Sequence, residues 1–103
     1  MPWFEIPAAT LVKEGEHKSF SVRNEKLLVC RVDTKLYAVS NYCPHVGALL
    51  TTGDLSQGQI TCSFHQWTFD VRTGDCTYPR QGPQLETKAT REINGILEVE
   101  LVE

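Results

Sequence analysis

A chain of 103 residues with 41% hydrophobic and 22% charged residues can bury the core of one domain and is too apolar to stay disordered. Its net charge of −3 includes no lysine or arginine run, which argues against nucleic acid as a partner, and no segment reaches the roughly 18 apolar residues of a membrane span. We therefore expect one domain over residues 1–103, monomeric and without a membrane partner. The absence of a leader pattern at the N-terminus predicts a cytoplasmic protein, and the mildly acidic surface suits a protein partner with a basic docking face.

The N-terminal part of the chain alternates short apolar runs with turn signals, a pattern typical of β-strands. Strands are predicted near residues 4–7, 18–22, 27–32 and 36–40. The turn signals lie at residues 14–15, 23–25 and 33–34, and residues 10–14 can form at most one turn of helix.

A hairpin is predicted near the C-terminus, where residues 88–93 and 96–101 flank Asn94-Gly95, a dipeptide that tolerates the positive φ angles of a two-residue turn. Residues 41–83 lie between the two strand-rich blocks and hold three of the four cysteines and two of the three histidines. We interpret them as a functional insert on an all-β scaffold.

Two Cys/His pairs in the insert suggest a metal centre. Cys43 and His45 are separated by one residue, and Cys62 and His65 by two. A structural zinc site is one possibility, although zinc knuckles usually pair like with like. Two mixed pairs suit a binuclear iron–sulfur cluster better, because one iron can take both thiolates and the other both imidazoles.

This C-x-H and C-x-x-H arrangement resembles the Rieske cluster-binding motif. Residues that match the family pattern around the ligands are 43–50, Gly53, 60–62, His65, 67–70 and 73–74. The resemblance covers essentially the whole chain. It implies an antiparallel β-sandwich or barrel, a small cluster-binding subdomain at about residues 41–83 inserted between strands, and one [2Fe–2S] cluster per chain bound by Cys43, His45, Cys62 and His65. A third, proline-containing loop would carry Pro79.

The resemblance also implies a function, that of the ferredoxin component of a bacterial multicomponent aromatic-ring oxygenase. Such a protein carries electrons from a flavin-containing ferredoxin reductase to a terminal oxygenase. The positions of the bridging cysteines in respiratory Rieske proteins read Ala48 and Phe64 here, and the position of their serine donor reads Trp67, which predicts a low potential within the Rieske range. Ser63 and Gln66 depart from many dioxygenase ferredoxins and favour a monooxygenase-type system.

Two further interpretations stay open at this point, a small subunit of a reductase such as assimilatory nitrite reductase and a zinc-stapled binding module. Catalysis by this chain is not expected, because a non-haem iron site needs two more histidines and only His17 remains.

The other notable side chains have simpler predicted roles. We expect Cys30 to be a small buried apolar residue and Cys76 to stay outside the ligand set. A Cys30–Cys76 disulfide is possible but disfavoured in the cytoplasm. His17 is predicted to be a solvated surface residue, and Trp67 and Phe69 to pack in the core. Four charged residues near the ligands are read as a solvated face first and a docking rim second: Asp70, Arg72, Asp75 and Arg80.

Overall fold

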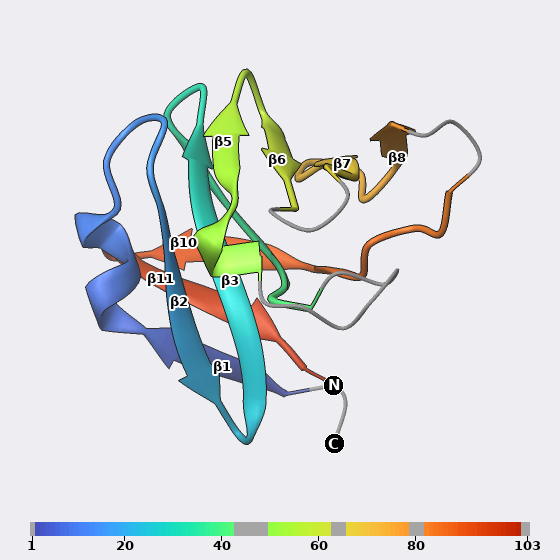
Figure 1. Ribbon diagram of the computed structural model, residues 1–103. Helices are drawn as coiled ribbons and strands as arrows, with labels where there is room; N and C mark the ends of the chain where they lie inside the picture. Colours follow the sequence, from blue (N-terminus) through green and yellow to red (C-terminus); the bar gives the residue numbers. More distant parts are fainter. Residues whose placement is uncertain (1, 43–49, 63–65, 79–81, 102–103) are drawn as a thin grey trace.

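The computed structural model describes residues 2–42, 50–62, 66–78 and 82–101, which form three antiparallel β-sheets (Figure 1). The first sheet has the order β1 (Trp3–Ile6), β11 (Ile96–Glu100), β10 (Thr90–Ile93). The second has the order β2 (His17–Val22), β3 (Glu25–Val32), β4 (Lys35–Ser40), β9 (Thr87–Lys88). The third has the order β5 (Asp54–Ser56), β6 (Gln59–Thr61), β7 (Thr68–Asp70), β8 (Cys76–Tyr78). Two short 3₁₀ helices, η1 (Pro7–Leu11) and η2 (Leu50–Thr52), complete the described elements.

Strand β3 separates the two hydrophobic cores of the protein. Its run from Leu27 to Cys30 is fully buried, because successive side chains point to opposite faces and both faces are covered. Leu27 and Val29 pack in the core shared with β1 and β11, whereas Leu28 and Cys30 pack in the core shared with β6 and β7. The β5–β8 sheet is therefore held on one face of the second sheet, and the β1–β11–β10 sheet on the other.

Tight two-residue turns join four of the paired strands. Both residues of each turn have positive φ, the conformation of a type I′ turn, whose twist matches that of the strands it joins. These turns are Arg23-Asn24, Asp33-Thr34, Gln57-Gly58 and Asn94-Gly95. Only the last has the sequence preferred for this turn, so cross-strand pairing fixes the other three where turn propensity does not.

The predicted all-β fold is confirmed, and most of its strands lie within one or two residues of their expected bounds. The helical turn predicted at residues 10–14 overlaps η1 only at Thr10 and Leu11, because Pro7 favours a first helical position and η1 begins there. The strands of the β5–β8 sheet were not predicted individually, since each is only three residues long. In the described part of the chain, no helix has the length and apolar character needed to cross a bilayer.

Candidate metal centre

Of the four predicted ligands, Cys62 is the one whose surroundings the structure describes. Cys43, His45 and His65 lie outside the described residues. Cys62 directly follows β6 and is fully buried in the same apolar core as Leu50 and Phe69. Its thiol is therefore presented from the end of a strand against an apolar wall.

Asn41 holds together the two ends of the first Cys/His segment, residues 42–49. Its backbone carbonyl accepts a hydrogen bond from the N–H of Leu50 at 2.9 Å. Its side-chain Oδ1 accepts one from the N–H of Thr51 at 3.0 Å, and its Nδ2 donates to Thr51 Oγ1 at 2.6 Å. Asn41 is only 2% exposed and its own N–H donates to the carbonyl of Lys26 in β3, so this clasp is anchored to the central strand.

The second Cys/His segment, residues 62–67, connects strands β6 and β7, and hydrogen bonds between these strands hold its two ends together. The N–H of Cys62 donates to the carbonyl of Trp67 at 2.7 Å, and the hydroxyls of Thr61 and Thr68 lie 3.2 Å apart on the paired strands β6 and β7. Gln66, the residue before Trp67, has a φ of 58°. This left-handed conformation helps the chain to reverse its direction before it pairs with Cys62. Both ends of this segment are therefore fixed by backbone pairing.

Gly53 brings the two segments together. It follows η2 at the end of the first segment, and its N–H donates to the carbonyl of Leu50 at 2.8 Å. A Cβ at this position would collide with the backbone carbonyl of Thr61, the residue before Cys62. Because only glycine permits this approach, the end of the first segment and the start of the second lie against each other.

His17 contradicts the prediction of a solvated surface residue. Its ring is partly buried, and Nε2 donates to the carbonyl of Gly53 at 3.0 Å, since a carbonyl only accepts. The other ring nitrogen, Nδ1, is buried without a hydrogen-bond partner among the described residues. The polar neighbours in sequence suggested exposure, whereas the fold places β2 beside Gly53. His17 therefore ties the second sheet to the junction of the two Cys/His segments.

The chain after β7 packs back onto the second segment. The N–H of Leu85 donates to the carbonyl of Gly74 at 2.8 Å, where Gly74 has positive φ and no room for a side chain. A Cβ at Gly82 would lie 2.5 Å from Sγ of Cys76 and 3.0 Å from the Trp67 ring. The described residues on both sides of Pro79, which itself lies outside them, are thus anchored close to Trp67.

The remaining cysteine and aromatic predictions can be compared with the packing. Cys30 is fully buried and forms no disulfide, and burial raises the pKa of its thiol to about 12. Phe69 is fully buried and Trp67 packs partly buried against the same core, as predicted. Cys76 is half-buried in β8, and its Sγ lies 3.5 Å from the carbonyl of Tyr78.

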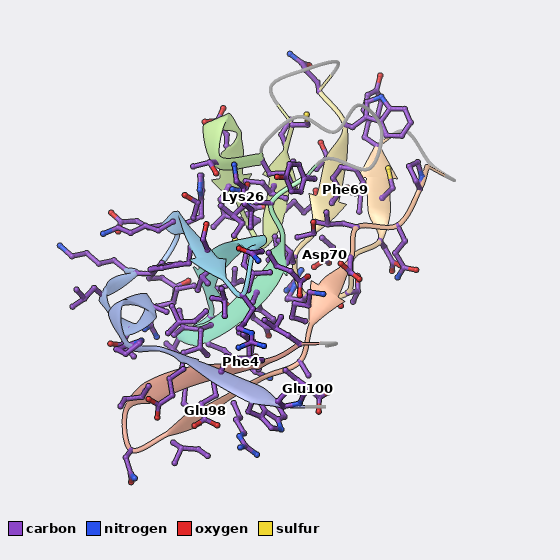
Figure 2. All side chains as sticks on the ribbon, turned by 90° about the horizontal axis from the view of Figure 1, so that it is seen from below. Phe4, Lys26, Phe69, Asp70, Glu98 and Glu100 are labelled. Atoms are coloured by element: carbon purple, nitrogen blue, oxygen red, sulfur yellow. The ribbon has the colours of Figure 1, made fainter. Side chains whose placement is uncertain are left out.

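Most of the charged residues predicted to flank the ligands lie at the far end of the β5–β8 sheet. Asp70 accepts two hydrogen bonds from the Arg72 guanidinium, at 3.0 and 3.1 Å. Burial alone would raise the pKa of Asp70, but the Arg72 contacts outweigh it and lower that pKa. In the register of the sheet Asp70 is opposite Gln59, beside the β5–β6 turn and away from Cys62. Arg80 lies outside the described residues. Figure 2 shows Asp70 with Phe69 among the side chains.

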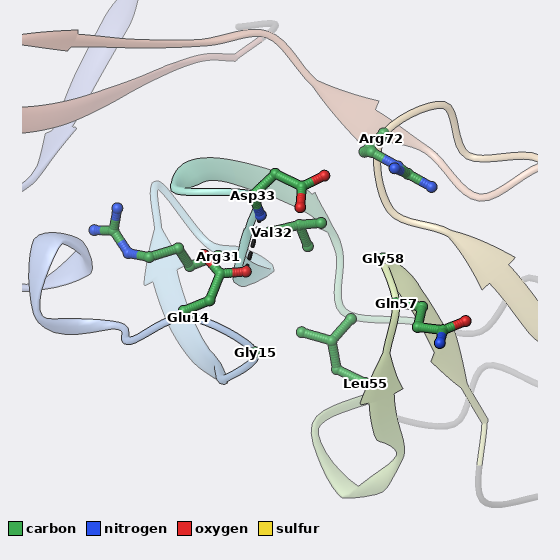
Figure 3. Close-up of a pocket in the computed structure, with 9 residues that line it drawn as sticks. All are labelled: Glu14, Gly15, Arg31, Val32, Asp33, Leu55, Gln57, Gly58 and Arg72. Carbon is green, nitrogen blue, oxygen red and sulfur yellow. Dashed lines mark hydrogen bonds between the residues drawn. The ribbon is translucent and has the colours of Figure 1, made fainter.

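A cavity of about 260 Å³ lies at this same far end, between the β3–β4 and β5–β6 turns (Figure 3). Three of its charged side chains form hydrogen bonds: Glu14 accepts from the N–H groups of Asp33 and Thr34, Arg31 donates to the carbonyl of Val12 at 2.6 Å, and Arg72 donates to Asp70. The three residues of β6 separate Gly58 of the turn from Cys62, a distance of about 13 Å along the strand. The cavity is therefore distinct from the candidate metal centre.

The described residues fit a binuclear iron–sulfur group. Cys62 is buried at the end of β6, backbone hydrogen bonds close the ends of both Cys/His segments, and Gly53 brings those ends together, which is compatible with a donor set drawn from both segments. The apolar core around Cys62 also keeps water away from its thiol.

Two supporting residues, Asn41 and His17, were not identified from the sequence. The sequence did offer one signal for Asn41. It lies between a predicted strand and a Cys/His pair, and its side-chain amide can both donate and accept hydrogen bonds, as a residue that closes a loop must. Nothing local to His17 indicated its contact with Gly53, which is 36 residues away.

Comparisons with known proteins agree with this geometry. Residues 2–92 match the model of the Rieske [2Fe-2S] domain. The chain is 35% identical over 72 residues to the ferredoxin component of the naphthalene 1,2-dioxygenase system of Pseudomonas putida, covering 70% of this chain and 69% of that protein. Some curated relatives are much longer: the chain is 33% identical to cholesterol 7-desaturase nvd of Xenopus laevis over 92% of its own length, but spans only 23% of that protein.

Solved structures of similar fold include the ferredoxin of carbazole 1,9a-dioxygenase from Nocardioides aromaticivorans IC177. That structure superposes with a TM-score of 0.87 at 26% identity, covering 96% of this chain and 97% of the ferredoxin. A chain from a complex of reduced oxygenase and oxidized ferredoxin in carbazole 1,9a-dioxygenase superposes with a TM-score of 0.84 at 28% identity, covering 94% of this chain and 91% of that one.

Proposed function

Because the chain belongs to the Rieske [2Fe-2S] domain family, we propose that it is an electron carrier that delivers electrons to a terminal oxygenase. The observation that carries this proposal is the likeness, over nearly the full length of both chains, to a ferredoxin of a carbazole 1,9a-dioxygenase system. The ferredoxin relative from the naphthalene system supports the same role. The electron donor in this proposal is a flavin-containing ferredoxin reductase.

The proposed ligands are Cys43 and Cys62 on one iron and His45 and His65 on the other. The buried position of Cys62 and the clasped ends of both segments support this assignment. In this proposal, residues of about 41–83 act as the cluster-binding subdomain of a single domain, which works as a monomer in the cytoplasm.

When bound, the cluster supplies one-electron redox chemistry, and the imidazole ligands favour the reduced form more than thiolates would. The protein contributes position and solvent exclusion. Asn41 fixes the ends of the first segment, Gly53 sets the approach of its end to the second, and the apolar core around Cys62 excludes water from that thiol.

The ligand assignment is tested on the purified holoprotein. Iron and labile sulfide should be present in equal amounts, and the reduced protein should give the EPR spectrum of a cluster with mixed nitrogen and sulfur ligation. His65→Cys should change or abolish that spectrum. An unchanged spectrum in the His65→Cys protein, or zinc in place of iron, would refute the assignment.

The carrier role is tested by electron transfer. The reduced protein should be reoxidised rapidly by a ring-hydroxylating terminal oxygenase with its substrate, and Ser63 and Gln66 favour an oxygenase of the monooxygenase type. Transfer to a sirohaem nitrite reductase and to no oxygenase would instead assign the chain to the reductase-subunit class.

A further inference from the structure

Asn94-Gly95 shapes the fold but has no part in the proposed carrier function. The dipeptide forms the turn between β10 and β11, where Asn94 has a φ of 53° and Gly95 a φ of 80°. Both residues are exposed, and a Cβ added at Gly95 would meet no atom of the described chain within 4 Å. The turn is therefore open to solvent.

The backbone N–H of Gly95 lies outside the ladder of the hairpin. In a two-residue turn, the residues on either side of the turn form its last hydrogen-bonded pair, and here these are Ile93 and Ile96. No hydrogen bond among the described residues uses the Gly95 nitrogen. Because glycine has no side chain, nothing shields this nitrogen from the side chain of Asn94.

Asn24 and Asn41, the two other asparagines of the chain, are held differently. The nitrogen that follows Asn24 belongs to Glu25, which pairs with Val22 at the start of β3. Asn41 is 2% exposed, and two hydrogen bonds with Thr51 hold its side chain. Both asparagines are followed by a residue with a large side chain. They provide an internal comparison for Asn94, because the same chemistry is hindered at both of them.

An unshielded nitrogen next to an asparagine side chain permits ring closure, a reaction that makes such asparagines chemically labile. The Gly95 nitrogen loses its proton and attacks Cγ of Asn94. A bond from this nitrogen to Cγ forms, the bond from Cγ to Nδ2 breaks, and ammonia leaves. Water then opens the resulting succinimide at one of its two carbonyls. Opening at Cγ gives aspartate, and opening at the main-chain carbonyl gives isoaspartate. Neither step needs an oxidant or a reductant.

We propose that Asn94 is a site of spontaneous deamidation, and that its isoaspartyl product loosens the first sheet but leaves the metal centre intact. Ring closure requires Asn94 to leave its positive φ, so the turn must open first. Opening is local, because the Ile93–Ile96 pair alone borders the turn and Ile93 is 42% exposed. Isoaspartate adds one carbon to the main chain, and the longer turn no longer fits the two-residue geometry that aligns β10 with β11.

The arrangement of the sheets separates this turn from the metal centre. Strand β11 contributes Leu97 and Val99 to the core on one face of β3, whereas Cys62 belongs to the core on the other face. Neither β10 nor β11 pairs with a strand of the β5–β8 sheet. A longer turn therefore disturbs the first core without reaching Cys62.

Ageing of the folded holoprotein tests the site. The protein is incubated at physiological temperature and slightly alkaline pH, digested, and analysed by mass spectrometry, in which deamidation adds one mass unit. The peptide with Asn94 should be converted at least about tenfold faster than those with Asn24 and Asn41, a factor equivalent to about 1.4 kcal/mol of activation free energy. An isoaspartyl methyltransferase with labelled S-adenosylmethionine should label the aged Asn94 peptide. Equal rates at the three asparagines, or an unlabelled peptide, would overturn the proposal.

The consequences for the fold are measured against Asn94→Asp, which adds the same negative charge without lengthening the main chain. Ion exchange separates the deamidated protein by its added charge, and the isoaspartyl fraction should unfold at a lower urea concentration than the Asn94→Asp protein. Both should keep the visible absorbance of the unaged holoprotein in buffer. Equal urea midpoints, or absorbance lost in step with deamidation, would contradict the inference. These measurements need no oxygenase, so their outcome is independent of the carrier function.

Discussion

Asn41 offers the sharpest test of how the fold supports the metal centre. Replacing it with alanine removes the Oδ1 acceptor of the Thr51 N–H and the Nδ2 donor to the Thr51 hydroxyl. The backbone hydrogen bonds of Asn41 to Lys26 and Leu50 remain possible, so the strand itself should persist. The substitution therefore removes the side-chain hydrogen bonds that hold the two ends of residues 42–49 together.

The cost can be estimated from these two contacts. Each hydrogen bond contributes about 1 kcal/mol net, and a partly buried donor left without an acceptor, here the Thr51 N–H, adds a cost of about 1–2 kcal/mol. The Asn41→Ala change should thus lower the free energy of opening the first segment by about 2–4 kcal/mol. Since about 1.4 kcal/mol corresponds to a factor of ten, the open state becomes about 30-fold more populated or more.

Cluster loss provides the assay, because the first segment must open before its ligands are released. The visible absorbance of the holoprotein is followed in moderate urea with an iron chelator, and Asn41→Ala should bleach about 30-fold faster than the unmodified protein. Ser40→Ala is the matched control, because the neighbouring hydroxyl accepts only a long 3.4 Å hydrogen bond from the exposed Tyr42 N–H. Its bleaching rate should change less than about threefold.

Similar bleaching rates for Asn41→Ala and Ser40→Ala would refute this reasoning. Such a result would mean that residues 42–49 are held closed by other contacts and that the buried amide is not what fixes them.

Three further predictions concern neighbouring parts of the fold. Gly53→Ala should cost at least about 2 kcal/mol of unfolding free energy in urea titrations, because its Cβ overlaps the Thr61 carbonyl; unchanged stability would contradict the close approach. Burial raises the pKa of Cys30 to about 12, whereas a thiol in the unfolded chain titrates near about 8.5. Deprotonation in that window favours the unfolded chain, so stability should fall as pH rises above about 8.5, by up to about 1.4 kcal/mol per unit, and the slope should be smaller in Cys30→Ala. His17→Leu removes the donor to the Gly53 carbonyl and should accelerate cluster bleaching about fivefold. His17→Gln keeps a donor and should bleach almost as slowly as the unmodified protein. Equal bleaching rates for the His17→Leu variant and the unmodified protein would show that this hydrogen bond does not stabilise the metal centre.

The prediction for His17 failed for a physical reason. Its polar neighbours in sequence indicated exposure, but its environment is made by Gly53, which the chain reaches only after β3, β4 and the first segment. The same limitation applies to Asn41, whose side-chain partner Thr51 lies ten residues away. Contacts of this kind depend on which strands pair, and local residue patterns do not specify them.

The sequence by itself determined the strand-rich character of the chain and the hairpin at Asn94-Gly95, because alternation and turn preferences are local properties. It also determined the two Cys/His pairs, since ligand type and spacing along the chain are local as well. Cys30 was correctly placed in the core from its apolar neighbours in β3.

Only the tertiary structure decided how these parts meet. Stacking the β5–β8 sheet on β3 buries Cys62, and the contact of Gly53 with Thr61 sets the two Cys/His segments side by side. The register of the same sheet puts Tyr78 at one end and Asp70 at the other. Backbone pairing and side-chain packing between residues distant in sequence fix these arrangements, so spacing along the chain could single out Cys62 as a candidate ligand but could not predict the Asn41 hydrogen bonds to Thr51 or the contact of Gly53 with Thr61.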